Sequence, residues 1–200
     1  MATPIEFYFD FTSPYGYLAS ERIEALATKF NRSVNWHAIL LGAVFKEIGT
    51  VPLISVPLKG DYSKHDMARS ARLMSIPFSL PTEFPKATIA AGRGFYWIQK
   101  QNPEQAKEFA RHVFRAYFTE DRDISSAEVV VAIASKVGID PNVFGAALQD
   151  SAVKERLKIA NDQAIAKGVF GSPFFFVDNE PFWGADRLPQ VERWLETGGY

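Results

Sequence analysis

The sequence predicts an α/β protein whose sheet is split by a large all-helical insertion. Strand-like patterns occur near the two ends of the chain, at residues 4–10, 33–41 and 172–184. The first two flank a helical pattern, which is typical of a βαβ unit with parallel strands. The segments between the ends are mostly helical in pattern. We therefore expect an α/β domain built from residues 1–45 and 152–200, with residues 46–151 forming a helical insertion domain.

The first strand and the helix after it have the clearest local patterns. Ile5, Phe7 and Phe9 alternate with other residues over PIEFYFD, which favours a strand. From Pro14 onward, apolar residues recur at helical spacing until Asn31 ends the run. The next segment, SVNWHAILL, predicts a second buried strand.

Prolines and glycines divide the middle of the chain. Residues 42–60 hold several of each and predict a surface loop, and residues 75–85 predict a proline-punctuated connection. Asn102 followed by Pro103 is a favoured helix start. The predicted helices cover residues 61–75, 86–101, 102–118, 125–138, 140–150 and 151–168.

The last thirty residues return to the sheet. SPFFFVD and PFWG predict two strands joined by a tight turn at Asn179-Glu180, which together make a hairpin. ADRLPQVERWLET predicts a short final helix. The order βαβ, helices, ββα is the basis for the split-sheet prediction.

Composition and charge exclude several classes of function. The net charge is −1 and the pI is about 6.3, so nothing indicates binding to nucleic acid or to a membrane. We find neither an apolar run of transmembrane length nor a signal peptide pattern, and expect a cytoplasmic protein. The chain has no cysteine, which excludes disulfides, thiolate metal sites and a protein thiol nucleophile. Any sulfur chemistry must therefore come from a bound cofactor.

Other residue types leave alternatives open. Seventeen phenylalanines indicate a large aromatic core, an aromatic-lined ligand pocket, or both. His37, His65 and His112 are scattered and do not stand at ligand spacing, so we expect no metal site. No nucleophile elbow, P-loop or dinucleotide-binding turn is present.

Ser13-Pro14 lies where the first strand gives way to the first helix. Serine is a favoured N-cap and proline a favoured first helical residue, so structure alone explains the pair. The same geometry gives a functional alternative, because a hydroxyl and unpaired amides at a helix start can stabilise a thiolate.

Two further motifs lie near the C-terminus. Ser172-Pro173 opens a predicted strand, and on base rates its peptide bond is trans. Asp186 either caps the last helix, with Arg187 solvated, or belongs to a cluster that grips a zwitterionic amino-acid group.

Four motifs in a fixed order resemble a known family. They are FYFDFTSPYGYLAS, DYSKHDMARSARLMSIPF, VFGSPFFFV and FWGADRL, and they span nearly the whole chain. This arrangement is similar to the DsbA-like branch of the thioredoxin fold. More narrowly, it resembles the 2-hydroxychromene-2-carboxylate isomerases and the related kappa-class glutathione transferases.

The resemblance implies a thioredoxin-like (DsbA-like) domain that binds glutathione. Ser13 would address the glutathione sulfur, and Pro173 would be cis. Thr50 stands where family members often have an asparagine that contacts glutathione. The full set of glutathione-binding residues implied in this way is Ser13, Pro14, Tyr15, Thr50, Ser172, Pro173, Gly184, Ala185, Asp186 and Arg187.

The resemblance also implies a reaction, in which the thiolate adds reversibly to a conjugated double bond. That chemistry would interconvert 2-hydroxychromene-2-carboxylate and trans-o-hydroxybenzylidenepyruvate in naphthalene-type aromatic catabolism. Tyr96 and Trp97 would line the pocket for this small aromatic carboxylate, unless they only pack between helices, and Lys59 or Lys64 would face its carboxylate. The alternatives are a kappa-like glutathione transferase and a non-catalytic thioredoxin-fold binding module. The family usually forms homodimers, so a homodimer is expected.

Overall fold

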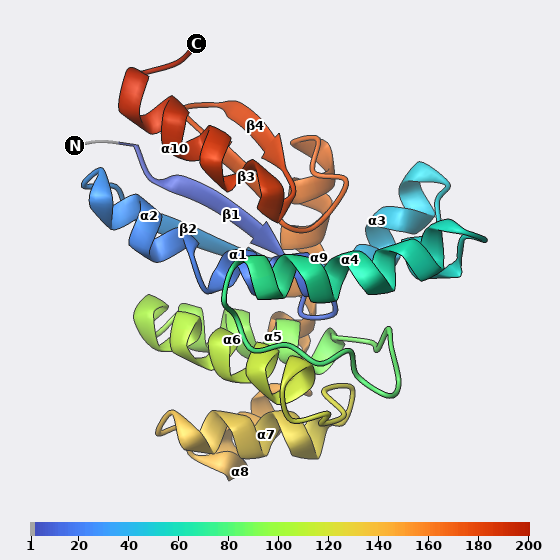
Figure 1. Ribbon diagram of the computed structural model, residues 1–200. Coiled ribbons are helices and arrows are strands. Elements are labelled where there is room, and N and C mark those ends of the chain that lie inside the picture. The colour runs from blue at the N-terminus through green and yellow to red at the C-terminus, as the bar shows by residue number, and fades with distance from the viewer. Residues whose placement is uncertain (1–2) are drawn as a thin grey trace.

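A four-stranded mixed sheet forms the centre of the protein in a computed structural model that describes residues 3–200 (Figure 1). The strand order is β2-β1-β3-β4. β1 (Ile5–Phe9) pairs in parallel with β2 (Val34–Ala38) and antiparallel with β3 (Phe174–Val177), which in turn pairs with β4 (Glu180–Trp183). The predicted split sheet is therefore confirmed, with strands from both ends of the chain side by side.

The helix predicted to run from Pro14 to Asn31 is wrong in one respect, because it is two helices. α1 (Pro14–Ser20) ends before α2 (Ile23–Lys29) begins. At the break, the Ser20 hydroxyl donates to the carbonyl of Tyr17 at 2.7 Å. Serine that bonds back to the preceding turn competes with the helical ladder and favours a bend.

The loop predicted over residues 42–60 is also partly wrong. α3 (Leu41–Ile48) lies there, followed by a short 3₁₀ turn, η1 (Leu53–Ser55), and then α4 (Lys59–Leu73). The buried face of α3 packs against α9, and the helix ends at Gly49, whose φ of 68° suits glycine. Figure 1 shows α3 and the first half of α4 projecting from the body. We call residues 41–65 the arm.

The remaining helices follow the predicted order. The Asn102 side chain accepts from the Gln105 amide at 3.1 Å and so caps α6, as expected. In Figure 1, α5 to α8 form a layer on one side of the sheet. The helices after α4 are α5 (Ile89–Gln99), α6 (Pro103–Phe118), α7 (Ala127–Lys136), α8 (Pro141–Ala147), α9 (Ser151–Ala166) and, after the hairpin and on the other side of the sheet (Figure 1), α10 (Leu188–Thr197). The domain boundaries at 45/46 and 151/152 stay a prediction.

Aromatic side chains join this helical layer to the sheet. Phe9 of β1 contacts Phe95 of α5 and Phe114 of α6, with ring centroids 5.3 and 5.6 Å apart. Phe11 packs 5.2 Å from Phe114. These rings are buried, so many of the phenylalanines build the core and fix the strand end that precedes Ser13. Within residues 3–200, no helix is both long and apolar enough to span a membrane.

Candidate active site

Ser13 sits at the point where β1 leads into α1, and it is almost completely buried. Its backbone is extended, and its Oγ accepts from the Gly16 amide at 3.0 Å, so it is the N-cap of α1. The same hydroxyl donates to the carbonyl of Ser172 at 2.8 Å. The Ser13 hydroxyl therefore caps α1 as an acceptor and bonds to Ser172 as a donor at the same time.

Ser172 reaches this place because β3 runs antiparallel to β1, so the start of one lies beside the end of the other. The Ser172–Pro173 peptide bond is cis, as the family resemblance implied. The Ser172 hydroxyl accepts from the Asp10 amide at 3.0 Å. The Pro173 carbonyl accepts from the Gly184 amide at 3.0 Å, which brings the end of β4 to the same edge.

Gly16 permits the close approach of α1 to this loop. A β-carbon added there would lie 2.8 Å from the Ser172 Oγ and 3.1 Å from the Ser13 Cβ. Both neighbours have short side chains fixed by hydrogen bonds, so neither yields at low cost. A side chain at this position would therefore push α1 away from the loop that carries Ser172.

Tyr15 ties the start of α1 to α4. Its hydroxyl donates to Asp66 at 2.6 Å, and Asp66 also pairs with Arg69, which donates to the Tyr62 hydroxyl at 2.9 Å. Burial, together with the bond to Asp66, raises the pKa of Tyr15, and the nearby Asp186 charge adds to the rise. The Tyr15 bond and then Arg69 hold the pKa of Asp66 below its ordinary value. Tyr15 therefore acts as a neutral donor that fixes α4 beside Ser13.

We expect Tyr15→Phe to lower the free energy of unfolding by about 1–2 kcal/mol at pH 7, because a bond to a charged acceptor is lost. Since the folded pKa of Asp66 is depressed, its contribution is complete above the unfolded pKa of about 3.9 and is lost as the pH falls through the folded value. Thermal melts at pH 7 and in acid would show the gap to the unaltered protein closing in acid. Tyr62→Phe is the control, since Tyr62 is well exposed. Equal losses from the two variants would contradict the role given to Tyr15.

Asp10 lies beneath this arrangement and was not predicted as a site residue. It follows the last residue of β1 and is only 2% exposed. Its carboxylate accepts from the Thr12 amide, the Leu41 amide and the Thr88 hydroxyl, at 3.0, 2.6 and 2.7 Å. Burial raises the pKa of the Asp10 carboxyl, and these three bonds oppose the rise.

The segment after β4 forms the open side of the site. η2 (Ala185–Arg187) packs against α1, and Asp186 pairs with Arg187 at 2.9 Å while both stay largely exposed. The Asp186 side chain makes no cap bond to η2 or to α10, so simple capping does not explain it. Gly184 adopts a φ of 112°, and an added β-carbon would lie 2.3 Å from the Asp186 Oδ1.

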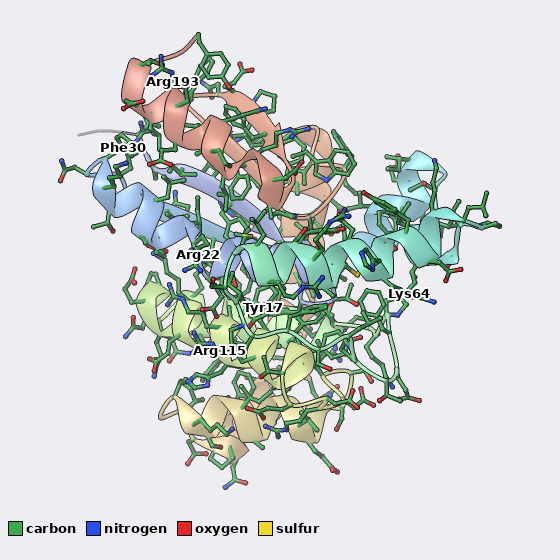
Figure 2. All side chains as sticks on the ribbon, in the orientation of Figure 1. Tyr17, Arg22, Phe30, Lys64, Arg115 and Arg193 are labelled. Carbon is green, nitrogen blue, oxygen red and sulfur yellow. The ribbon has the colours of Figure 1, made fainter. Side chains whose placement is uncertain are left out.

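The structure brings together one group of predicted site residues and leaves another apart. Hydrogen bonds and packing between elements join the segments that carry Ser13, Pro14, Tyr15, Ser172, Pro173, Gly184, Ala185, Asp186 and Arg187. Thr50, Lys59 and Lys64 lie on the arm, where Figure 2 labels Lys64 on α4, and within residues 3–200 no hydrogen bond joins these three residues to the first group. The Lys64 ammonium pairs with Asp61 at 3.2 Å. The roles predicted for these three residues stay predictions.

Tyr96 and Trp97 have packing contacts within the helical layer. The Tyr96 hydroxyl donates to the Ala38 carbonyl at 2.8 Å, and the Arg156 guanidinium lies 4.3 Å from the Tyr96 ring centroid. Trp97 meets Phe144 edge-on at 5.7 Å. These contacts account for both rings, so the packing alternative has direct support while their role toward a substrate stays a prediction.

Sequence reasoning missed Asp10 and Asp66, although one of them carried a signal. Asp10 is an acid directly after an apolar strand and two residues before the Thr-Ser-Pro turn, an unusual place for a charge. Asp66 lies on α4, and nothing local distinguishes it from other helix acids. In residues 3–200, no cluster of three or more His, Cys, Asp or Glu side chains could hold a metal ion.

Comparison with known proteins adds a consistent set of relatives. The family model for the DSBA-like thioredoxin domain matches residues 4–196. The 2-hydroxychromene-2-carboxylate isomerase of Pseudomonas putida is 33% identical over 190 residues, covering 94% of this chain and 92% of its own. Glutathione S-transferase kappa 1 of Rattus norvegicus is 24% identical over 208 residues, covering 96% and 92%. A solved structure of a 2-hydroxychromene-2-carboxylate isomerase matches with a TM-score of 0.87 at 32% identity, covering 96% of this chain and 94% of that one.

Proposed function

The chain belongs to the DSBA-like thioredoxin family and, within it, to the 2-hydroxychromene-2-carboxylate isomerases, which are enzymes, and we propose that it catalyses this isomerisation with glutathione as cofactor. The reaction would interconvert 2-hydroxychromene-2-carboxylate and trans-o-hydroxybenzylidenepyruvate. One observation carries the proposal: the Ser13 hydroxyl at the start of α1 is fixed 2.8 Å from the Ser172 carbonyl, which lies just before β3.

The residues at the site fit glutathione in three respects. Within residues 3–200, the Ser172 amide has no hydrogen-bond partner and its carbonyl is bonded only to Ser13, so this backbone can pair with an added peptide. Asp186 and Arg187 offer exposed charges of both signs, which suits an amino-acid group with an ammonium and a carboxylate. The Ser13 hydroxyl can turn its proton from the Ser172 carbonyl to a sulfur while still capping α1.

Bound glutathione would supply a thiolate able to add reversibly to the conjugated double bond of the substrate, which allows rotation about that bond. The Ser13 hydroxyl would hold the sulfur as an anion by donating to it. The Tyr15 amide has no acceptor within residues 3–200, so it is available as a second donor at the start of α1. Donors fixed in advance stabilise an anion without reorganisation, which is their usual catalytic value.

Two broader parts of the proposal concern the metabolic pathway, which rests on the named relatives, and the oligomeric state, which rests on the surface of the arm. Such a reaction would place the enzyme in the naphthalene-type catabolism of aromatic compounds. We also propose a homodimer, because the arm exposes a row of apolar side chains that a second copy could cover. They are Ile48, Val51, Leu53 and Leu58, and their exposed fractions run from 46% to 90%.

The test is an absorbance assay of 2-hydroxychromene-2-carboxylate isomerisation with and without glutathione. We expect a rate that needs glutathione and leaves its concentration unchanged. Consumption of glutathione without isomerisation would favour the kappa-like transferase, whose relatives also match this chain. Binding of glutathione without turnover of this substrate or of general electrophiles would favour a non-catalytic module.

A further inference from the structure

The Asp10 carboxylate is a buried charged group that the proposed reaction does not use. It accepts three hydrogen bonds from three different segments: its own loop through Thr12, the β2–α3 junction through Leu41, and the start of α5 through Thr88. The loop, the junction and the helix all meet directly below Ser13. Their relative positions therefore depend on a single pair of oxygens.

The backbone of Asp10 extends the same connection to the site itself. Its amide donates to the Ser172 hydroxyl at 3.0 Å, and its carbonyl accepts from the Ser13 amide at 2.9 Å. Together with the three side-chain bonds, this links Asp10 to both of the segments that hold the Ser13–Ser172 contact. A shift of Asp10 would move Ser13 and Ser172 with it.

Thr88 gives independent evidence for this connection, because its side chain bonds to Asp10 in place of capping its own helix. It occupies the N-cap of α5, where a hydroxyl ordinarily accepts from the first helical amides. Here the side chain caps nothing, is 3% exposed, and donates to Asp10 at 2.7 Å instead. Thr88 therefore bonds to a carboxylate far away in the sequence and does not cap its own helix.

The chemistry of the pocket requires an acceptor with two oxygens. Two donors point at the Asp10 Oδ1 and one at its Oδ2. An asparagine would turn an NH₂ group toward one of these donors, and an apolar residue would leave all of them unpaired at a substantial cost. Asp10 is thus matched to this place by its chemistry as well as its size.

We infer that Asp10, held by Thr88, is the positioning residue of the site: it fixes the Thr12–Ser13 turn so that the Ser13 hydroxyl faces the space beside Ser172. This inference deepens the proposed function and rests on it for the role of Ser13. Asp10 and Thr88 are both buried, so neither side chain is expected to touch the reacting groups. Their effect on the reaction passes through Ser13.

The experiment compares Thr88→Val, Thr88→Ser and Asp10→Asn with the unaltered protein. Two quantities are measured: hydrogen exchange of the Thr12, Ser13 and Leu41 amides in the free protein, and kcat for glutathione-dependent isomerisation. Thr88→Val removes one bond to the carboxylate with little change of volume. We expect it to speed exchange at these amides and to lower kcat about tenfold, because the Ser13 donor is then less precisely positioned. Thr88→Ser keeps the hydroxyl, so its amide exchange and kcat should match those of the unaltered protein. Asp10→Asn should speed exchange and lower kcat at least as much as Thr88→Val does.

Ser63→Ala serves as the structural control, because Ser63 is a buried hydroxyl that donates to the Gly60 carbonyl at 2.7 Å on the arm. It should lower the melting temperature without changing Ser13 exchange or kcat. Unchanged exchange at Ser13 in both Thr88→Val and Asp10→Asn would overturn the inference whatever the activity. Faster exchange with an unchanged kcat would overturn it as well.

The two proposals fail in different ways. If the unaltered protein shows no glutathione-dependent rate while Thr88→Val still loosens the Ser13 amide, the proposed function fails and the positioning of Ser13 stands. The exchange measurement needs no glutathione, so it decides the geometry independently.

Discussion

Replacing Ser13 with alanine is expected to lower kcat for the glutathione-dependent isomerisation by about 10²–10³-fold while lowering the free energy of unfolding by only about 1 kcal/mol. The two effects differ because the hydroxyl makes two kinds of bond. As an acceptor it caps α1 through the Gly16 amide, and as a donor it faces Ser172 and the proposed thiolate position. Loss of the first affects folding, and loss of the second removes a donor present at the reacting atom.

A matched variant separates these roles. Ser126 is the N-cap of α7, its side chain accepts from the Val129 amide, and it lies in the helical layer away from the site. Ser126→Ala should lower stability by a similar amount and leave the rate unchanged. Steady-state kinetics and chemical denaturation of both variants would decide the matter. If Ser13→Ala keeps its rate, the proposed mechanism is wrong.

The second large effect is expected from Gly184→Ala, which should raise the KM for glutathione about tenfold or more. The glycine φ of 112° and ψ of 147° lie in a region that other residues rarely occupy, at a cost of about 1–3 kcal/mol. The new β-carbon would also lie 2.3 Å from the Asp186 Oδ1 and displace that carboxylate. Displacing one charge of the pair proposed to hold the amino-acid group should weaken glutathione binding far more than it slows the bound reaction.

Gly198→Ala is the control, because it introduces backbone strain at a glycine with positive φ without displacing a charged side chain. Gly198 ends α10 with a φ of 72°, and an added β-carbon there would meet nothing within 4 Å. We expect lower stability and an unchanged KM. A similar rise of KM in both variants would show that general strain, and not the position of Asp186, controls glutathione affinity.

Much of the fold could be predicted from local patterns, and the errors have local causes. The strand PIEFYFD, the Asn102 cap of α6 and the C-terminal hairpin each carry their signal within a few residues, and all three are present. α3 was missed because its eight residues stand next to a proline-rich segment that suggested a loop throughout. The break between α1 and α2 depends on one serine bonding backward, which apolar spacing does not reveal.

The site was only half predictable because its bonds join distant parts of the chain. Ser13 and Ser172 were identified through family resemblance, and their contact spans 159 positions. The bond from Thr88 to Asp10 spans 78 positions, and that from Tyr15 to Asp66 spans 51. Such pairs follow from the strand order and from helix packing, so a pattern of residue types along the chain cannot specify them.

The strand order also has a consequence for biosynthesis. β1 leaves the ribosome well before β3, one of its two neighbours, because α1 to α9 lie between them in the chain. Until residues 174–177 emerge, the edge of β1 that β3 will occupy has no partner, and an open apolar strand edge favours association with other chains. The nascent chain must keep that edge protected while the intervening helices are synthesised, and the Ser13–Ser172 contact can form only after Ser172 has emerged.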